Sequence, residues 1–293
     1  MRALRIHAYG GPEVMRLDDV PAPEAAQGEL VVRIHAASVN PIDWKMREGL
    51  MQAPLPRTLG RDGAGMAAGK RVMGIGVPGR DGTHAEFALF PSAACAEIPA
   101  GVSFEEAAAV GIAGVSAWIP LVENAKVGSA QRVLVHGGAG GVGSLAIQIA
   151  HHRGAAVWTT CSSHNAQWCR GLGAERTIDY RREDFAALGQ VFDAVLDTVG
   201  GAVHARSAEV LKPGGVLAFL NAAPRQPVTR QDIRIMPTDV RATKERLSAL
   251  LALLSRKELR APVEARFPLE RGAEAYELSR SGHARGKIVL QIS

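Results

Sequence analysis

The chain has few cysteines and no uncharged segment with the pattern of a membrane span, and each absence argues against a class of protein. Its 293 residues include three cysteines, Cys95, Cys161 and Cys169, none of them in a Cys-x-x-Cys pair. We therefore expect neither a disulfide framework nor a structural zinc site, and a reducing, cytoplasmic compartment fits this usage. The first residues lack the apolar stretch of a secretory signal. The longest segment without Asp, Glu, Lys or Arg is 133–152, and its five glycines indicate strand, turn and helix instead of a membrane span.

A large excess of one charge is also absent. The 34 Lys and Arg residues against 29 Asp and Glu residues give a formal net charge of +5, and no basic run occurs. A nucleic-acid partner is therefore not expected. Hydrophobic residues make up 47% of the chain and charged residues 22%, which is ordinary for a folded protein. Because about 150 residues is typical of one domain, this length predicts two domains.

The first third of the chain is rich in strand patterns, and the pattern changes near Ser103. Strands bounded by Gly- and Pro-containing turns are expected at 3–8, 14–19, 29–38 and 83–90. Ser103 and Glu106 have the spacing of a capping box, which predicts the start of a helix. A second helix is expected at 115–124.

From Arg132 onward, short apolar runs alternate with helical patterns. The runs expected as buried strands are 133–136, 155–160, 176–178, 194–197 and 216–220. The helices expected between them are 142–153, 165–172, 183–188 and 203–211. This alternation predicts an α/β architecture, with a parallel sheet covered by helices on both faces. The remaining elements are expected as a helix at 245–256, a strand at 263–267, a helix at 269–280 and a strand at 287–292.

A glycine-rich turn between the first of these strands and its helix is the strongest chemical signal. The turn consists of Gly138, Ala139, Gly140, Gly141, Val142 and Gly143. Glycine permits tight backbone geometry and close approach of a ligand, and the helix N-terminus offers free N–H groups and partial positive charge. In this strand–turn–helix context, the pattern predicts binding of a dinucleotide diphosphate. The alternative is a tight turn that binds nothing.

The end of the next strand favours NADPH over NADH. NAD-binding proteins usually place an acidic residue about 20 residues after the glycines, where it binds the ribose 2′-hydroxyl. Here the chain has Ser162, Ser163 and His164 and no acid. Because the serine hydroxyls can donate hydrogen bonds and the histidine can carry charge, they predict a 2′-phosphate site. A helix N-cap at either serine is compatible with the same residues.

Seven segments, in order along nearly the whole chain, match one known family. They are AASVNPID at 36–43, LGRDGAG at 59–65, GKRVMG at 69–74, VHGGAGGVG at 135–143, DAVLDTVGG at 193–201, LKPGG at 211–215 and GKIVL at 286–290. Together they resemble the zinc-independent quinone oxidoreductase branch of the medium-chain dehydrogenase/reductase family, the zeta-crystallin-like enzymes. The resemblance implies a GroES-like β-barrel catalytic domain at 1–118, completed by 257–293. It also implies a Rossmann doubly wound parallel sheet at 119–256 and a homodimer formed through a sheet edge near 233–236.

Zinc-dependent relatives hold a catalytic metal with Cys and His at two positions where this chain has Asn40 and Arg61. Asparagine is a poor zinc ligand and arginine cannot be one, so no metal is expected. Hydrogen bonds must then polarise the substrate. The chain also departs from the family pattern, since Lys45 stands in place of the typical active-site tyrosine. Only Met-Ala-Ala lies between Gly65 and Gly69, so one barrel strand is expected to be shortened, which can widen the cleft or weaken the barrel.

Two residues are candidates for the catalytic role. The Asn40 amide can donate to a carbonyl or to the nicotinamide ribose, or it can be a turn residue before Pro41. Lys45 can polarise a carbonyl or donate a proton, or it can be a solvated surface lysine. Asp43 is expected to have a local structural role, paired with Arg47 four residues along a helix.

Four further residues are candidates for the cofactor side: Tyr180, Thr198, Leu220 and Asn221. The resemblance places Tyr180 at the adenosine phosphate, and the alternative is an aromatic residue at the rim. The other three follow strands at their carboxyl ends, where ligands of doubly wound sheets bind.

Two other residues are expected to be structural. His136 ends the first strand of the parallel sheet, and we expect its ring to be satisfied by hydrogen bonds inside the fold. Lys287 can reach a cofactor phosphate, but an exposed position at the C-terminal edge is favoured.

The sequence therefore predicts an NADPH-dependent oxidoreductase that reduces quinones or α,β-unsaturated carbonyls by zinc-independent hydride transfer. A non-catalytic NADPH-binding sensor or scaffold is the alternative, because an intact cofactor turn with an altered substrate side would suit it. The expected partner is a small-molecule quinone or enone, with neither nucleic acid nor membrane.

Overall fold

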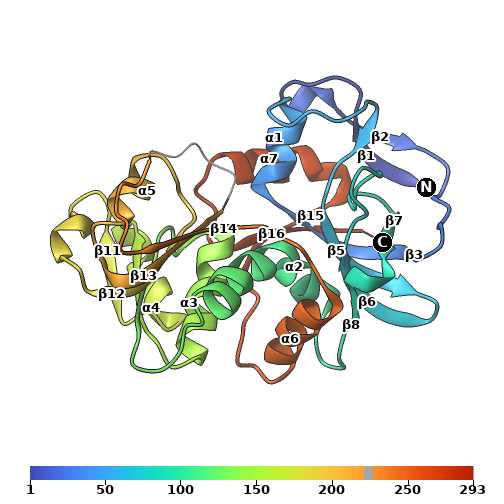
Figure 1. The fold of residues 1–293 in the computed structure, drawn as a ribbon. Coiled ribbons are helices and arrows are strands. Elements are labelled where there is room, and N and C mark those ends of the chain that lie inside the picture. Colours follow the sequence, from blue (N-terminus) through green and yellow to red (C-terminus); the bar gives the residue numbers. More distant parts are fainter. Residues whose placement is uncertain (221–226, 293) are drawn as a thin grey trace. The chain divides into compact units, whose positions relative to one another are not determined.

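The computed structural model describes residues 1–220 and 227–292, and the chain forms two compact units (Figure 1). The first unit comprises Met1–Val115 and Ala242–Ser293, and the second comprises Ser116–Arg241. The chain therefore returns to the first unit at 241/242, earlier than the expected domain boundary at 256/257. Helix α6 (Lys244–Ser255) belongs to the first unit because it packs against strand β8.

The first unit is built mainly from antiparallel strands. They are β1 (Arg2–Ile6), β2 (Met15–Asp19), β3 (Glu29–Val39), β4 (Arg57–Thr58), β5 (Asp62–Ala67), β6 (Lys70–Ile75), β7 (Phe87–Pro91), β8 (Cys95–Glu97), β15 (Val263–Pro268) and β16 (Lys287–Gln291). One sheet has the order β2–β1–β4, and the other has the order β15–β16–β3–β5–β6–β8 with β7 paired to β3. Only the β15–β16 pair of the larger sheet is parallel. Strand β3 thus joins the chain's two ends in one sheet, which confirms the GroES-like expectation.

The shortened segment before Gly69 is a tight hairpin between β5 and β6. Ala68 and Gly69 form its tip, with φ of 47° and 76°. Positive φ at both central residues suits the right-handed twist of a two-residue hairpin. Strand β5 pairs along its whole length with β6 and also with β3. The shortening therefore leaves this part of the sheet continuous.

A single long helix replaces the two that were expected between 103 and 124. Helix α2 (Phe104–Trp118) runs directly into a π-helical segment, Ile119–Asn124. Ser103 and Glu106 form the predicted capping box, because each backbone N–H donates to the other's side chain, at 2.8 and 3.1 Å. Gly114 lets the helix continue under close packing, since an added Cβ would lie 2.8 Å from Leu250.

The combined helix Phe104–Asn124 is long and apolar enough to cross a membrane. However, 72% of its most apolar window is buried inside the fold, as in the core helix of a folded domain. The other helices of the first unit are α1 (Pro41–Arg47) and α7 (Gly272–Arg280).

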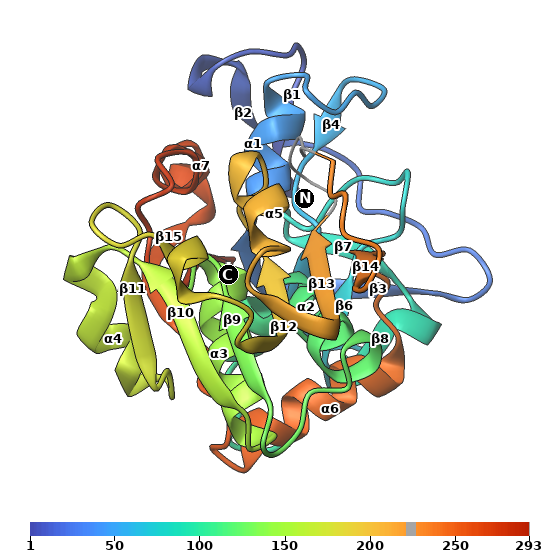
Figure 2. The same cartoon turned by 60° about the vertical axis from the view of Figure 1, so that its left-hand side comes forward.

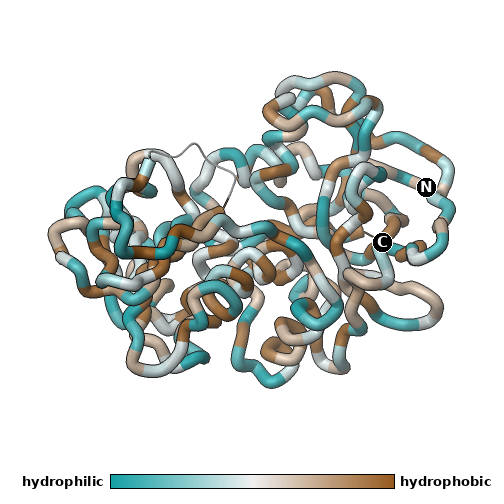
Figure 3. Tube along the Cα trace, viewed as in Figure 1, coloured by the Kyte–Doolittle hydropathy of each residue, from teal (hydrophilic) through white to brown (hydrophobic). Residues whose placement is uncertain are grey.

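The second unit contains one parallel sheet of six strands. They are β9 (Arg132–Val135), β10 (Ala156–Cys161), β11 (Arg176–Asp179), β12 (Phe192–Asp197), β13 (Leu211–Leu220) and β14 (Arg234–Thr238). Figure 2 shows their order, β11–β10–β9–β12–β13–β14, and every pair is parallel. In chain order this is 3-2-1-4-5-6, the doubly wound Rossmann arrangement, as predicted. Long brown, hydrophobic stretches follow this sheet in Figure 3, because strands covered on both faces need apolar side chains throughout.

The helices of the second unit are α3 (Gly141–His152), α4 (Ala166–Gly171) and α5 (Ala202–Ser207). The expected helix at 183–188 was wrong in type, because Phe185–Leu188 is a short 3-10 turn. The Asp184 side chain caps this turn by accepting from Ala186 N at 3.1 Å. Gly189, with φ of 71°, ends it.

Candidate functional site

The glycine-rich turn joins β9 to α3 in the second unit, and its glycines have different roles. Gly137 has a φ of 70°, which a residue with a side chain rarely adopts. A Cβ on Gly138 would collide with the Thr159 hydroxyl, and a Cβ on Gly143 would collide with the Gly137 carbonyl. Gly140 differs, since within residues 1–220 and 227–292 an added Cβ would meet only the Gly137 carbonyl oxygen, at 3.4 Å. Packing therefore requires glycine at three positions, while Gly140 borders open space.

This turn lies where ligands bind in doubly wound sheets. Strands β9 and β12 are adjacent, but the chain leaves them in opposite directions along the sheet, so the turn after β9 is at the topological switch point. Helix α3 begins at Gly141, and the first amides of a helix have no partner within it. Ala139, Gly141 and Val142 thus belong to a segment that can present N–H groups and the positive helix end to an anion.

Hydrogen bonds among buried polar groups of the second unit fix the start of the glycine-rich turn. His136 is buried, and its ring nitrogens lie 3.1 Å from the hydroxyls of Thr160 and Ser207. The same Thr160 hydroxyl accepts from Gly137 N at 3.1 Å, and Thr198 donates to the His136 carbonyl at 2.7 Å. Burial lowers the pKa of His136 to about 4, so the ring is neutral at neutral pH. The expectation of a satisfied structural histidine is confirmed.

The residues expected near a 2′-phosphate follow two adjacent strands. Cys161 of β10 pairs with Asp179 of β11, so Ser162 and Tyr180 leave the sheet side by side. Ser162 is half-buried at the N-cap of a 3-10 turn (Ser163–Asn165) without a side-chain cap.

Three of the other predicted cofactor-side residues lie at the surface of the same strand ends: Ser163 and His164 are exposed, and Tyr180 is 56% exposed. Leu220 ends β13 and is half-buried. Asn221 lies outside the described residues.

In the first unit, Asn40 is the centre of a buried polar network. Its side chain is 4% exposed. The Asn40 amide nitrogen donates to Asp62 Oδ1 at 2.7 Å, and Lys287 Nζ donates to the Asn40 amide oxygen at 2.6 Å. Ser38 donates to the same Asp62 oxygen at 2.8 Å, while Ile112 N donates to the other at 2.6 Å. Both ends of the Asn40 amide are therefore held by charged neighbours.

Lys287 is a component of this network that sequence reasoning missed. It was expected at an exposed edge, but it is 3% exposed. Its burial lowers the pKa of the ammonium group, while Asp62 and Asp43 act to raise it. The available signal was a lysine that opens the apolar run KIVL, whose four residues are all buried in β16.

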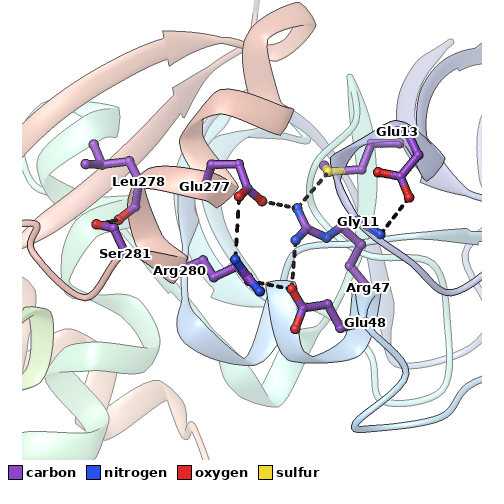
Figure 4. A network of polar contacts seen from close by, with 9 residues as sticks. Gly11, Glu13, Arg47, Glu48, Glu277, Leu278, Arg280 and Ser281 are labelled. Carbon is purple, nitrogen blue, oxygen red and sulfur yellow. Dashed lines mark hydrogen bonds and ion pairs between the residues drawn. The ribbon is translucent and has the colours of Figure 1, made fainter.

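The expected Asp43–Arg47 pair does not form. Asp43 instead accepts from Asn40 N at 2.7 Å, which caps the start of α1. Arg47 is fully buried and donates to Glu277 on α7 at 2.8 Å and to Glu48 at 3.1 Å (Figure 4). Burial raises the pKa of Asp43 to about 7, with the charge of nearby Asp62 acting in the same direction.

A second buried contact adjoins the network. His84 lies 2.8 Å from the Tyr276 hydroxyl and 3.2 Å from the Ser38 carbonyl. Burial lowers the pKa of His84 to about 4 and raises that of Tyr276. Lys45, in contrast, is half-buried on α1, with Nζ 5.6 Å from the centre of the Trp44 ring.

Comparison with known proteins assigns family models to both ends of the chain. Residues 26–100 match the alcohol dehydrogenase GroES-like domain, and residues 172–290 match the zinc-binding dehydrogenase model. Within the described ranges 1–220 and 227–292, no group of three or more His, Cys, Asp or Glu side chains is placed to hold a metal ion.

Curated relatives match almost the whole chain. The 2-methylene-furan-3-one reductase of Solanum lycopersicum is 32% identical, with 99% of this chain and 79% of the relative covered. The chloroplastic NADPH-dependent alkenal/one oxidoreductase of Arabidopsis thaliana is 30% identical over the same shares of each chain.

Solved structures also match this chain over nearly its whole length. The quinone oxidoreductase from Coxiella burnetii has a TM-score of 0.92 and 33% identity, covering 100% of this chain and 99% of that one. The Escherichia coli quinone oxidoreductase complexed with NADPH has a TM-score of 0.89 and 25% identity, covering 99% and 100%.

Proposed function

Because the chain belongs to the quinone oxidoreductase branch of the medium-chain dehydrogenase/reductase family, we propose that it reduces quinones or α,β-unsaturated carbonyls with NADPH. The observation that carries this proposal is the glycine-rich turn at the switch point of a Rossmann sheet. Beside Gly140 the described part of the chain leaves open space, where one protein atom lies within 4 Å of an added Cβ. A diphosphate fits such a cradle at a helix N-terminus.

The second unit supplies the groups that would hold NADPH. Backbone amides of Ala139, Gly141 and Val142 would bind the diphosphate, since those of Gly137, Gly138 and Gly140 already donate within the fold. Ser162, Ser163, His164 and Tyr180 would surround the adenosine 2′-phosphate, since hydroxyls and an imidazole suit that anion. Thr198 and Leu220, and Asn221 by sequence position, would border the nicotinamide side. When bound, NADPH supplies the hydride, while the chain supplies orientation and electrostatics.

In the first unit, we assign different roles to the two catalytic candidates. Asn40 is a positioning residue, because its side-chain amide is already satisfied by Asp62 and Lys287. Its backbone N–H donates to Asp43 and caps the start of α1. Lys45, on the same helix and half-buried, is the group proposed to donate a proton or polarise the carbonyl.

The test is NADPH oxidation by the purified protein with 1,4-naphthoquinone and with methyl vinyl ketone. We expect turnover with at least one of them. A Lys45→Met variant should lose roughly 100-fold in kcat, in the range of general acid catalysis. NADPH binding without turnover would contradict the proposal and support the sensor alternative.

We also propose that the enzyme works in the cytoplasm, away from membranes, as a homodimer joined through β14. This strand is an edge of its sheet, and Ile235 on it is 40% exposed. Unpaired edges with exposed apolar residues are suited to pairing with another chain. Light scattering on the eluted protein should give twice the chain mass, whereas an Ile235→Lys variant should elute as a monomer.

A further inference from the structure

A cavity in the first unit contains a guanidinium group that the proposed function does not use. The cavity has about 370 Å³ of empty space, part of it open to solvent. Its walls are the segments 57–61 and 76–82, together with Asp43 and Met46. It therefore adjoins the Asn40 network, because Asp43 belongs to both.

Two of the three arginines in its walls are already engaged. Arg57 donates to the carbonyls of Gly79, at 2.8 Å, and of Arg80. Arg80 donates to the Glu24 carbonyl at 3.3 Å and lies 3.7 Å from the Glu29 carboxylate. These two side chains hold the loop 76–82 in place.

The acidic groups in the walls are engaged as well. Asp81 accepts from Thr58 N at 2.9 Å and lies 3.5 Å from the Arg5 guanidinium. Asp43 accepts from Asn40 N, and burial raises its pKa to about 7. Much of its negative charge is therefore removed near neutral pH, which leaves the cavity with an excess of positive charge.

Arg61 is the remaining charged residue in the walls of the cavity. It is half-buried, and across residues 1–220 and 227–292 its guanidinium has no hydrogen bond or ion pair, although the electrostatic effect of its charge reaches Asp43. Its backbone carbonyl is fixed by Gly76 N at 2.7 Å. A planar guanidinium presents a fork of donors that matches a carboxylate or sulfonate, and partial burial strengthens that contact.

We infer that Arg61 and this cavity bind an anionic group of the substrate, so that the enzyme prefers quinones or enones that carry a carboxylate or sulfonate. The inference rests on the proposed function. Because the group is remote from the reacting double bond, its binding should act mainly on KM. Hydrogen bonds to charged groups are worth about 1.5–3 kcal/mol, which corresponds to a preference of about 10- to 150-fold.

The experiment compares benzylideneacetone bearing a para carboxylate with its methyl ester, using the whole protein and saturating NADPH. In the wild type, kcat/KM should be higher for the acid. Arg61→Gln should lower the acid-to-ester ratio of kcat/KM by about 10-fold or more, and Arg61→Lys should retain part of it. Arg16→Gln, which removes an exposed arginine of the same unit, should leave the ratio unchanged. Thermal melts of each variant check that it is folded.

The outcomes separate this inference from the proposed function. Equal kcat/KM for acid and ester in the wild type would overturn the inference alone. An unchanged ratio in Arg61→Gln, accompanied by a weaker affinity for NADPH, would also overturn it, because Arg61 would then serve a cofactor phosphate. Turnover of neither compound, nor of the simple quinone and enone, would refute the proposed function itself.

Discussion

Replacing Lys287 by Met should destabilise the first unit strongly. Lys287 Nζ lies 2.6 Å from the Asn40 amide oxygen and 3.4 Å from the Val39 carbonyl oxygen. Methionine fills a similar volume but removes the charge and the donors. The Asn40 oxygen would then lose its partner, and the buried carboxylates of Asp62 and Asp43 would lose a cation that interacts with both.

The expected loss in the free energy of unfolding follows from the burial of these charged groups. Removing one partner of a buried ion cluster leaves uncompensated charge and costs about 3–5 kcal/mol. At about 2–4 °C per kcal/mol for a unit of this size, the lower estimate corresponds to a melting transition about 6–12 °C lower.

The assay is thermal and urea unfolding followed by circular dichroism, with Lys70→Met as the matched control. Lys70 pairs with Glu97 at 2.9 Å, but its side chain is 65% exposed. Such a surface pair is worth about 1 kcal/mol or less. If Lys287→Met and Lys70→Met cost the same, the network around Asn40 does not stabilise the fold as argued.

Three further predictions concern the second unit and the buried histidines. Gly143→Ala should distort the turn and lower the melting temperature of its unit, because the new Cβ would collide with the Gly137 carbonyl; an unchanged melt and NADPH affinity would contradict this. His84 and His136 should titrate near 4 by NMR of their ring protons, because burial lowers both pKa values. In the unfolded chain both histidines take up a proton as the pH falls below about 6.5, so the free energy of unfolding should fall between pH 6.5 and pH 4. Titration of either histidine near pH 6.5 in the folded protein would refute this prediction. Ser162→Ala should weaken NADPH binding about tenfold in calorimetry, by loss of a charge-assisted hydrogen bond, and leave NADH binding unchanged; equal losses for both would remove the 2′-phosphate role.

The parallel sheet was largely predictable from the sequence, but its strand β14 was expected only through the family resemblance, as a sheet edge near 233–236. Strands such as β9 are continuous apolar runs, which are typical of strands covered on both faces. Strand β14 reads RIMPT, and its outer residues are partly exposed because it lies at the sheet edge. A proline and a charged residue are well tolerated at such an edge. No local pattern therefore identified this segment as a strand.

The polar network of the first unit was not predictable, because its partners are distant in sequence. Lys287 and Asn40 are 247 residues apart, and Asn40 and Asp62 are 22 apart. The local rule that paired Asp43 with Arg47 failed, since Arg47 pairs with Glu277, 230 residues away, and with the adjacent Glu48. The motifs located Asn40, but only the fold gives its partners.

The central claim is that the backbone at the glycine-rich turn binds the diphosphate of NADPH, and Gly140 tests it most directly. Among the described residues, an added Cβ there meets only the Gly137 carbonyl oxygen, at 3.4 Å, so Gly140→Val should fold like the wild type and still obstruct the ligand. Gly171→Val, at another open glycine of the same unit, is the control. Calorimetric titration with NADPH should show tight binding by the wild type and Gly171→Val, and binding at least tenfold weaker, about 1.4 kcal/mol or more, by Gly140→Val. Equal NADPH affinity of all three proteins would contradict the account.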